Sequence, residues 1–179
     1  MPRSASILVL VATMLLVACS TAPKTAEDRA ELERRSRGAL ALMKEQDPSL
    51  RGELEDAYGY AIFPTVGKGG LGVGGAYGRG IVYEEGEMVG YCDLSQGTIG
   101  LQIGGQAYSE LILFEYEEAL DHFKTGNFAF SAQASAVAIE SGASADAKYD
   151  RGVKVITMPK AGAMLEASIG GQKFDYRRK

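Results

Sequence analysis

Apolar residues between positions 26 and 46 recur at the spacing of one helical face. Strong helix formers fill this segment, with acidic residues early and a lysine late, which suits the dipole of a helix. Asp47-Pro48 then interrupts the pattern. The sequence therefore predicts a helix over 26–46 and a second, short helix over 49–58. The apolar positions of the first helix are Leu32, Ala39, Leu42 and Met43.

From residue 59 onward the pattern changes to the two-residue alternation of strands. Over 68–84, the alternate residues that share one face of the strand are mostly glycine or alanine, and those on the other face have mostly bulky side chains. Because glycine weakens strands, its repetition on one face implies a close approach of another backbone, a tight bend or a ligand. We expect a hairpin turn at 84–87, a return strand over 88–93 and a further turn at 95–97. The small face comprises Gly70, Gly72, Gly74, Ala76, Gly78 and Gly80.

The second half of the chain mixes one helix with further strands. Ser109 is a suitable N-cap for a helix that runs to about Lys124. Strand patterns follow over 128–139, 152–158 and 163–176, and residues 177–179 form a basic tail. These elements predict a single α+β domain over 26–179. In it, N-terminal helices and a central helix pack on a curved, mostly antiparallel, glycine-rich sheet or small barrel.

The N-terminus has the features of a secretion signal. Residues 1–18 contain one positive charge and an apolar run over 7–17, which is shorter than the ~20 residues of a membrane-spanning helix. The run ends in Leu-Val-Ala-Cys19, which resembles the lipobox of bacterial lipoproteins, whose cysteine thiol takes a diacylglycerol. We therefore expect a signal peptide over 1–18, lipidation of Cys19 and a lipidated tether over 19–25. The alternative is an ordinary secretion signal with a chance cysteine.

Composition and motifs argue against several classes of function. Without residues 1–18 the formal net charge falls from −4 to −5, which argues against nucleic-acid binding. A G-x-G-x-x-G pattern occurs over 70–75, but strand and turn residues follow where a nucleotide site needs a helix. His122 is the only histidine, Cys92 is the only cysteine besides Cys19, and the sequence lacks both metal-ligand spacing and a nucleophile elbow. We expect no disulfide, cofactor, metal site or enzyme activity.

Several sequence blocks in fixed order carry a family resemblance. They lie at 57–64, 68–70, 74–80, 98–106, 113–114 and 118–120, and include Phe-Pro, Lys-Gly-Gly and Gly-Leu-Gln-x-Gly-Gly-Gln patterns. From Ala39 to about Ala138, and more faintly to the C-terminus, the chain resembles the SYLF domain, also called the Ysc84 actin-binding or lipid-binding domain. The resemblance implies binding of membrane lipids, with phosphoinositides as the eukaryotic ligands. Some eukaryotic members also bind actin, which a bacterial envelope lacks, so actin binding is not carried over.

The resemblance implies that this chain binds phospholipid headgroups. The expected site residues are Lys68, which matches the basic position of the family, and nearby Arg79. The basic tail at 177–179 is a rival site. We expect a lipid-anchored protein of the bacterial envelope that has membrane phospholipids as partners. Because Ser20 follows the lipidated cysteine, we expect the outer membrane, facing the periplasm. In the alternative, the chain is a structural or protein-interaction lipoprotein whose lipid is only a tether.

Overall fold

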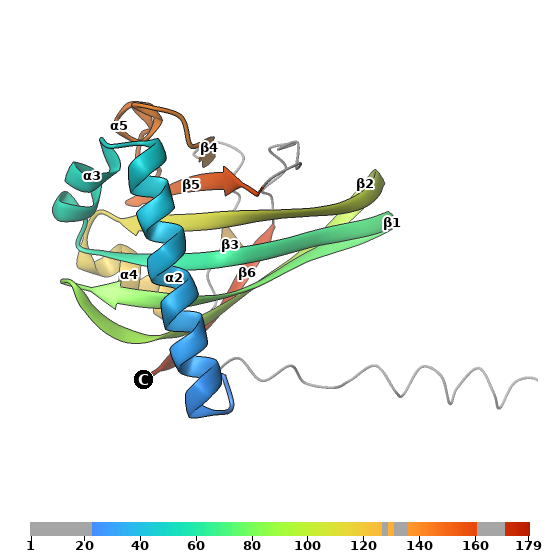
Figure 1. Ribbon diagram of the computed structural model, residues 1–179, viewed down its shortest axis with the longest axis horizontal. Coiled ribbons are helices and arrows are strands. Elements are labelled where there is room, and N and C mark those ends of the chain that lie inside the picture. The colour runs from blue at the N-terminus through green and yellow to red at the C-terminus, as the bar shows by residue number, and fades with distance from the viewer. Residues whose placement is uncertain (1–22, 127–128, 131–135, 161–170) are drawn as a thin grey trace, which may run out of the picture.

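The computed structural model describes residues 23–126, 129–130, 136–160 and 171–179. Helix α2 (Ala26–Gln46) crosses one side of a sheet, and helix α4 (Glu117–Lys124) lies on the other side (Figure 1). This arrangement confirms the predicted α+β fold. The remaining elements are α3 (Leu50–Asp56), α5 (Ala143–Asp146), β1 (Gly59–Glu84), β2 (Glu87–Phe114), β3 (Ala129–Phe130), β4 (Ala136–Ala138), β5 (Val153–Pro159) and β6 (Gln172–Arg178).

Helix α2 has the bounds that the sequence predicts because both of its ends are specified locally. The Thr25 side chain accepts a hydrogen bond from the backbone N–H of Asp28, 3.0 Å away, which caps the first turn. At the other end, Asp47 leaves the helical conformation before proline. The predicted apolar face is buried against the sheet with one exception: Leu42 is 56% exposed.

A long hairpin of β1 and β2 forms the centre of the sheet. Its turn lies where predicted, with Glu85 and Gly86 in the left-handed backbone region. The first half of β2 pairs with β6, its second half pairs with β5, and β1 lies along its other edge. All pairings between the described strands are antiparallel except that of β4 with β5. The strand order β3-β6-β2-β5-β4 is that of an open sheet rather than a closed barrel.

Strand β2 corrects two of the predictions. The expected turn at 95–97 does not form, because these residues continue β2 between β1 and β6. The expected helix from Ser109 is shorter, because residues 109–114 pair with β1 and β5 and only 117–124 are helical. The predicted strand over 152–158 is confirmed as β5. The predicted strands over 128–139 and 163–176 lie only partly in the described ranges, where β3, β4 and the first residues of β6 are found.

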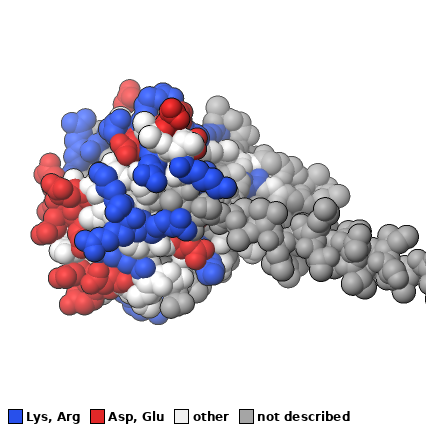
Figure 2. All heavy atoms as spheres, turned by 90° about the horizontal axis from the view of Figure 1, so that it is seen from below, with Lys and Arg blue, Asp and Glu red and all other residues white. Residues whose placement is uncertain are grey.

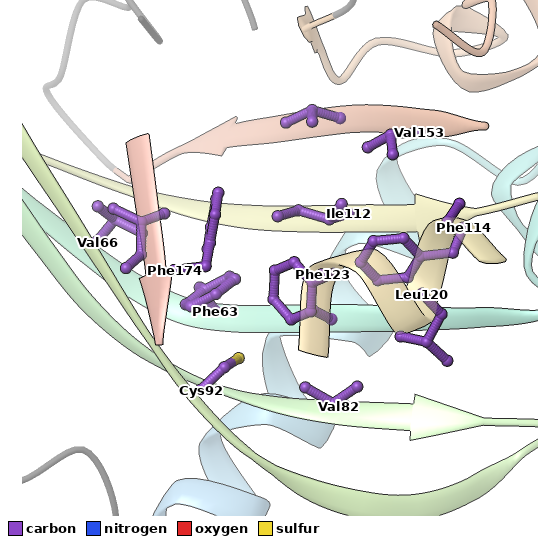
Figure 3. Close-up of a cluster of buried hydrophobic side chains, with 14 of the residues drawn as sticks. Phe63, Val66, Val82, Cys92, Ile112, Phe114, Leu120, Phe123, Val153 and Phe174 are labelled. Carbon is purple, nitrogen blue, oxygen red and sulfur yellow. The ribbon is translucent and has the colours of Figure 1, made fainter. Parts of the chain in front are cut away.

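The sheet separates two apolar clusters. The outer cluster packs Leu32, Met43 and their neighbours in α2 against side chains such as Ile81 and Tyr91. The inner cluster lies on the concave side, where Phe123 of α4 contacts both Phe114 and Phe174 with ring centroids 5.0 and 5.1 Å apart (Figure 3). These two clusters cover both faces of the central strands, so those strands are apolar at successive positions.

Two glycines of β1 allow its ends to approach each other. A Cβ atom on Gly80 would lie 2.7 Å from the Phe63 ring and 2.8 Å from the Ile62 carbonyl oxygen. A Cβ atom on Gly78 would lie 2.9 Å from Val66. The close approach expected for the small face is therefore found at these two positions.

Inside the concave face lies a buried polar pair. Glu110 and Gln172 are both 0% exposed, and Gln172 Nε2 donates to Glu110 Oε2 over 3.0 Å. Burial raises the pKa of Glu110 to about 7, although the hydrogen bond from Gln172 acts in the opposite direction.

Among the helices of the described residues, none is both long enough and apolar enough to cross a membrane.

Candidate anion-binding surface

Strand pairing brings basic side chains from two strands, β1 and β6, onto the outer face of the sheet. Arg79 of β1 pairs with Asp93 of β2, which pairs in turn with Asp175 of β6. Directly paired residues point to the same face, and so do residues two positions apart on one strand. Lys173 and Arg177 therefore lie on the same face as Arg79. We call this surface the basic face and define it as Arg29, Arg79, Lys173 and Arg177.

The fourth member of the basic face comes from α2. The Arg29 guanidinium lies 5.9 Å from the centre of the Tyr91 ring, and Tyr91 is paired with Arg177. The C-terminus and the first turn of α2 lie together at the bottom of the view in Figure 1. Figure 2, which looks from below, shows lysine and arginine side chains running across this side of the molecule, with acidic side chains gathered toward one edge.

The net charge of the basic face depends on pH, because the acidic residue Asp93 lies beneath it. Arg79 Nε donates to the Tyr77 hydroxyl over 3.0 Å and lies 4.0 Å from Asp93 Oδ1. Burial raises the pKa of Asp93 to about 6, a shift that Arg79 and Arg177 oppose. Asp93 therefore gains its negative charge, and offsets one of the surrounding cations, in the pH range just below neutrality.

A cavity of about 370 Å³ extends the basic face between α2 and β1. Arg79 and Tyr77 line it from the strand, Arg35 lines it from the helix, and acidic Asp28 and Glu31 stand at its helical wall. Pro23 also lines the cavity, and its carbonyl oxygen accepts a hydrogen bond from Arg29 Nε over 3.3 Å. The start of the described chain is thus held against the basic face.

The structure does not bring Lys68 and Arg79 together. The two residues are eleven positions apart on one strand, so their side chains leave opposite faces. Lys68 lies on the side of Val66, in the inner cluster, and is 7% exposed. Arg79 lies on the side of Ile81, in the outer cluster, and its side chain is 44% exposed. The odd spacing of Lys68 and Arg79 in the sequence therefore already predicts that their side chains lie on opposite faces.

The grouping around Arg79 is not predicted from the sequence. The basic tail is expected to be a rival site, whereas β6 carries Arg177 to the same face as Arg79. The helical pattern over 26–46 does not indicate that Arg29 joins them. The third predicted site residue, Cys19, lies outside the described residues, four positions before Pro23.

Comparison with known proteins adds two findings. Residues 95–179, just under half of the chain, match the family model described as "Ysc84: Las17-binding protein actin regulator". A curated relative, beta cell expansion factor A of Aeromonas veronii, is 29% identical over 154 residues, which cover 85% of this chain. The chain spans only 59% of that relative's length. These matches agree with the resemblance predicted from the sequence: residues 95–179 are similar to the Ysc84, or SYLF, family model.

Proposed function

We propose that this protein is a lipid-anchored envelope lipoprotein whose folded domain binds anionic phospholipid headgroups, without catalysis, through the basic face. The observation that carries the proposal is the position of Pro23. It contacts Arg29, lines the same cavity as Arg79, and follows the predicted lipidation site Cys19 by four residues. The family description names binding and no chemical reaction.

Chain length couples the anchor to the basic face. Four residues span at most about 14 Å when fully extended, so a lipid on Cys19 would hold Arg29 and Arg79 close to the membrane surface. Electrostatic attraction decays with a screening length of ~8 Å at physiological salt, so only charges near the tether would contribute strongly. Local cations can therefore bind a negative membrane although the whole chain is acidic.

The guanidinium groups of the basic face also suit the ligand chemically. Arginine donates two parallel hydrogen bonds to a phosphate, and such charge-assisted bonds are the strong kind. Lys68 would have to bind a headgroup from the opposite face of β1, so it constitutes a separate predicted site and is tested separately.

The anchor is tested by mass. In the envelope of the producing bacterium, intact protein extracted from the membrane should begin at Cys19 and carry the added mass of acyl chains. The Cys19→Ser variant should remain uncleaved or appear in the soluble fraction. An unmodified Cys19 in the membrane fraction would contradict the anchor without affecting the headgroup proposal.

Headgroup binding is tested with residues 20–179, which contain all the described helices and strands. Vesicles of phosphatidylcholine, with and without phosphatidylglycerol, are sedimented with the protein. We expect binding only to the anionic vesicles. The triple variant Arg29→Ala, Arg79→Ala and Arg177→Ala should bind about 100-fold more weakly, since each cation near a membrane contributes ~1 kcal/mol.

The matched control removes one cation from α3 and two from the loop between α5 and β5: Arg51→Ala, Lys148→Ala and Arg151→Ala. It changes the net charge equally and should bind like the wild type. Equal losses in both variants would mean that net charge, not the basic face, governs binding. A loss in Lys68→Ala alone would move the site to the inner face. If the wild type ignores anionic vesicles, the lipid serves only as a tether for a protein-interaction domain.

A further inference from the structure

A second, larger cavity lies between the C-terminal half of α2 and the sheet. Its volume is about 700 Å³, within the ~300–1,000 Å³ range of small-molecule sites. Residues of β1, β2 and β5 form its floor, next to the irregular pairing between Phe63 and Val66. At this irregularity, Ser109 Oγ donates to the Pro64 carbonyl oxygen over 2.9 Å, which fixes the floor of the cavity.

Two cations face this cavity from different elements. Arg35 projects from α2 and donates to Thr65 Oγ1 over 2.8 Å, and Lys160 follows the end of β5. Burial lowers the pKa of Lys160, and the positive charge of Arg35 lowers it further. Within the described part of the chain, neither cation lies within ion-pair distance of an acid. Glu45 lines the cavity as well, so the lining has one net positive charge.

The remaining wall of the cavity is largely apolar. Leu42, which the helical pattern predicts to be buried, is 56% exposed and borders the cavity. Ala39, Pro64 and Met158 continue this wall. A cavity with two cations at one end and an exposed leucine along its wall matches an amphiphile, which has a charged end and an apolar body.

We infer that this cavity binds one molecule of an anionic single-chain amphiphile of the fatty acid class. Its carboxylate would lie between Arg35 and Lys160, where it relieves their mutual repulsion. Its hydrocarbon chain would lie along Leu42, Ala39 and Met158. This site takes a single molecule into a hollow, so it differs from the proposed membrane contact at the basic face.

The ligand class is tested by calorimetric titration of residues 20–179 with three compounds below their aggregation limits. Laurate has both the anion and the chain, dodecanol has only the chain, and acetate has only the anion. We expect saturable one-to-one binding of laurate and at least tenfold weaker binding of both other compounds. Equal binding of dodecanol, equal binding of acetate, or no binding of laurate would each overturn the inference.

The location is tested with variants outside the basic face. Lys160→Ala should weaken laurate binding about tenfold, and Leu42→Glu should abolish it by placing a negative charge at the apolar wall. Ala41→Glu is the matched control, because it adds the same charge to the neighbouring exposed position of α2, which does not line the cavity. Thermal melts verify that each variant is folded. Laurate binding that survives Lys160→Ala and Leu42→Glu would place the ligand elsewhere and overturn the inference.

Vesicle sedimentation of Lys160→Ala separates this inference from the proposed function. Lys160 is not part of the basic face, so this variant should still bind anionic vesicles at the wild-type level while its laurate binding falls. If both fall together, the cavity and the vesicle contact are one site and the inference of a separate ligand is wrong.

Discussion

At the scale of single residues, Glu110 is a carboxyl group that folding places away from water. It has no exposed surface, one oxygen accepts from Gln172, and the other has no hydrogen-bond partner among the described residues. A buried carboxylate without full hydrogen bonding costs free energy, and protonation removes most of that cost. The pKa of about 7 results because burial favours the protonated carboxyl group more strongly than the Gln172 hydrogen bond favours the ionised one.

This pKa predicts a stability that depends on pH. The pKa of Glu110 rises from 4.5 in the unfolded chain to about 7 in the folded one, so between these values the folded state binds more protons. The free energy of unfolding should therefore fall as pH rises from 4.5 to 7, by about 3 kcal/mol. Glu110→Gln keeps the acceptor for Gln172 and removes this loss.

Denaturant unfolding at pH 4 and pH 8 provides the measurement. Glu110→Gln should match the wild type at pH 4 and exceed its free energy of unfolding at pH 8. The control Glu87→Gln, at the exposed hairpin end, should change neither value. A Glu110→Gln variant that is less stable at pH 8 would show that the folded protein stabilises the ionised carboxylate.

At the scale of elements, the helix α2 was predictable and the second half of β2 was not. Thr25 and Asp47 specify the ends of α2 in the sequence. Residues 111–114 form an unbroken apolar run, which fits either a helix or a strand buried on both faces. Ile112 and Phe114 belong to the inner cluster, while Leu111 and Leu113 belong to the outer one. Only pairing with distant β1 and β5 decides between the two structures.

The close approach within β1 makes Gly80 the sharpest test of the small face. A valine there would bring its Cβ within 3 Å of the Phe63 ring and the Ile62 carbonyl oxygen. The carbonyl oxygen belongs to the backbone of a paired strand, so it cannot move away as easily as the end of a flexible side chain. We expect Gly80→Val to lower the free energy of unfolding by at least ~1–3 kcal/mol, the usual cost of overpacking a core.

Gly67→Val is the control, because Gly67 lies in the same strand and a Cβ atom there would meet nothing within 4 Å. Valine suits strands, so this variant should be as stable as the wild type or slightly more stable. Thermal or denaturant unfolding of both variants provides the comparison. Equal stability of the two variants would mean that the segments around Gly80 can separate at little cost.

At the scale of the whole molecule, the basic face depends on pairings that span the chain. Arg29, Arg79 and Arg177 come from α2, β1 and β6. Their charges are visible in the sequence, but the register of β6 against β2 decides that Arg177 joins Arg79. The opposite faces of Lys68 and Arg79, in contrast, follow from their odd spacing within one strand.

The last prediction concerns how pH regulates this assembled surface. Asp93 lies beside Arg79, with Arg177 nearby on the same face, and has a pKa of about 6. Below pH 6 it is protonated and the basic face has one more net positive charge. Vesicles with phosphatidylglycerol should therefore bind more tightly at pH 5 than at pH 7.5, about fivefold for one charge worth ~1 kcal/mol.

Asp93→Asn identifies the residue responsible. Without a carboxyl group at this position, binding at pH 7.5 should rise to the level that the wild type reaches at pH 5, and the dependence on pH should largely disappear. Asp175→Asn removes an acid from the same face, next to Asp93, but should keep a pH response. That response should move to slightly lower pH, because Asp175 helps burial to raise the pKa of Asp93. If Asp93→Asn keeps the wild-type ratio, the pH response arises from another group. If the wild type binds equally at both values, Asp93 does not control the charge of the basic face.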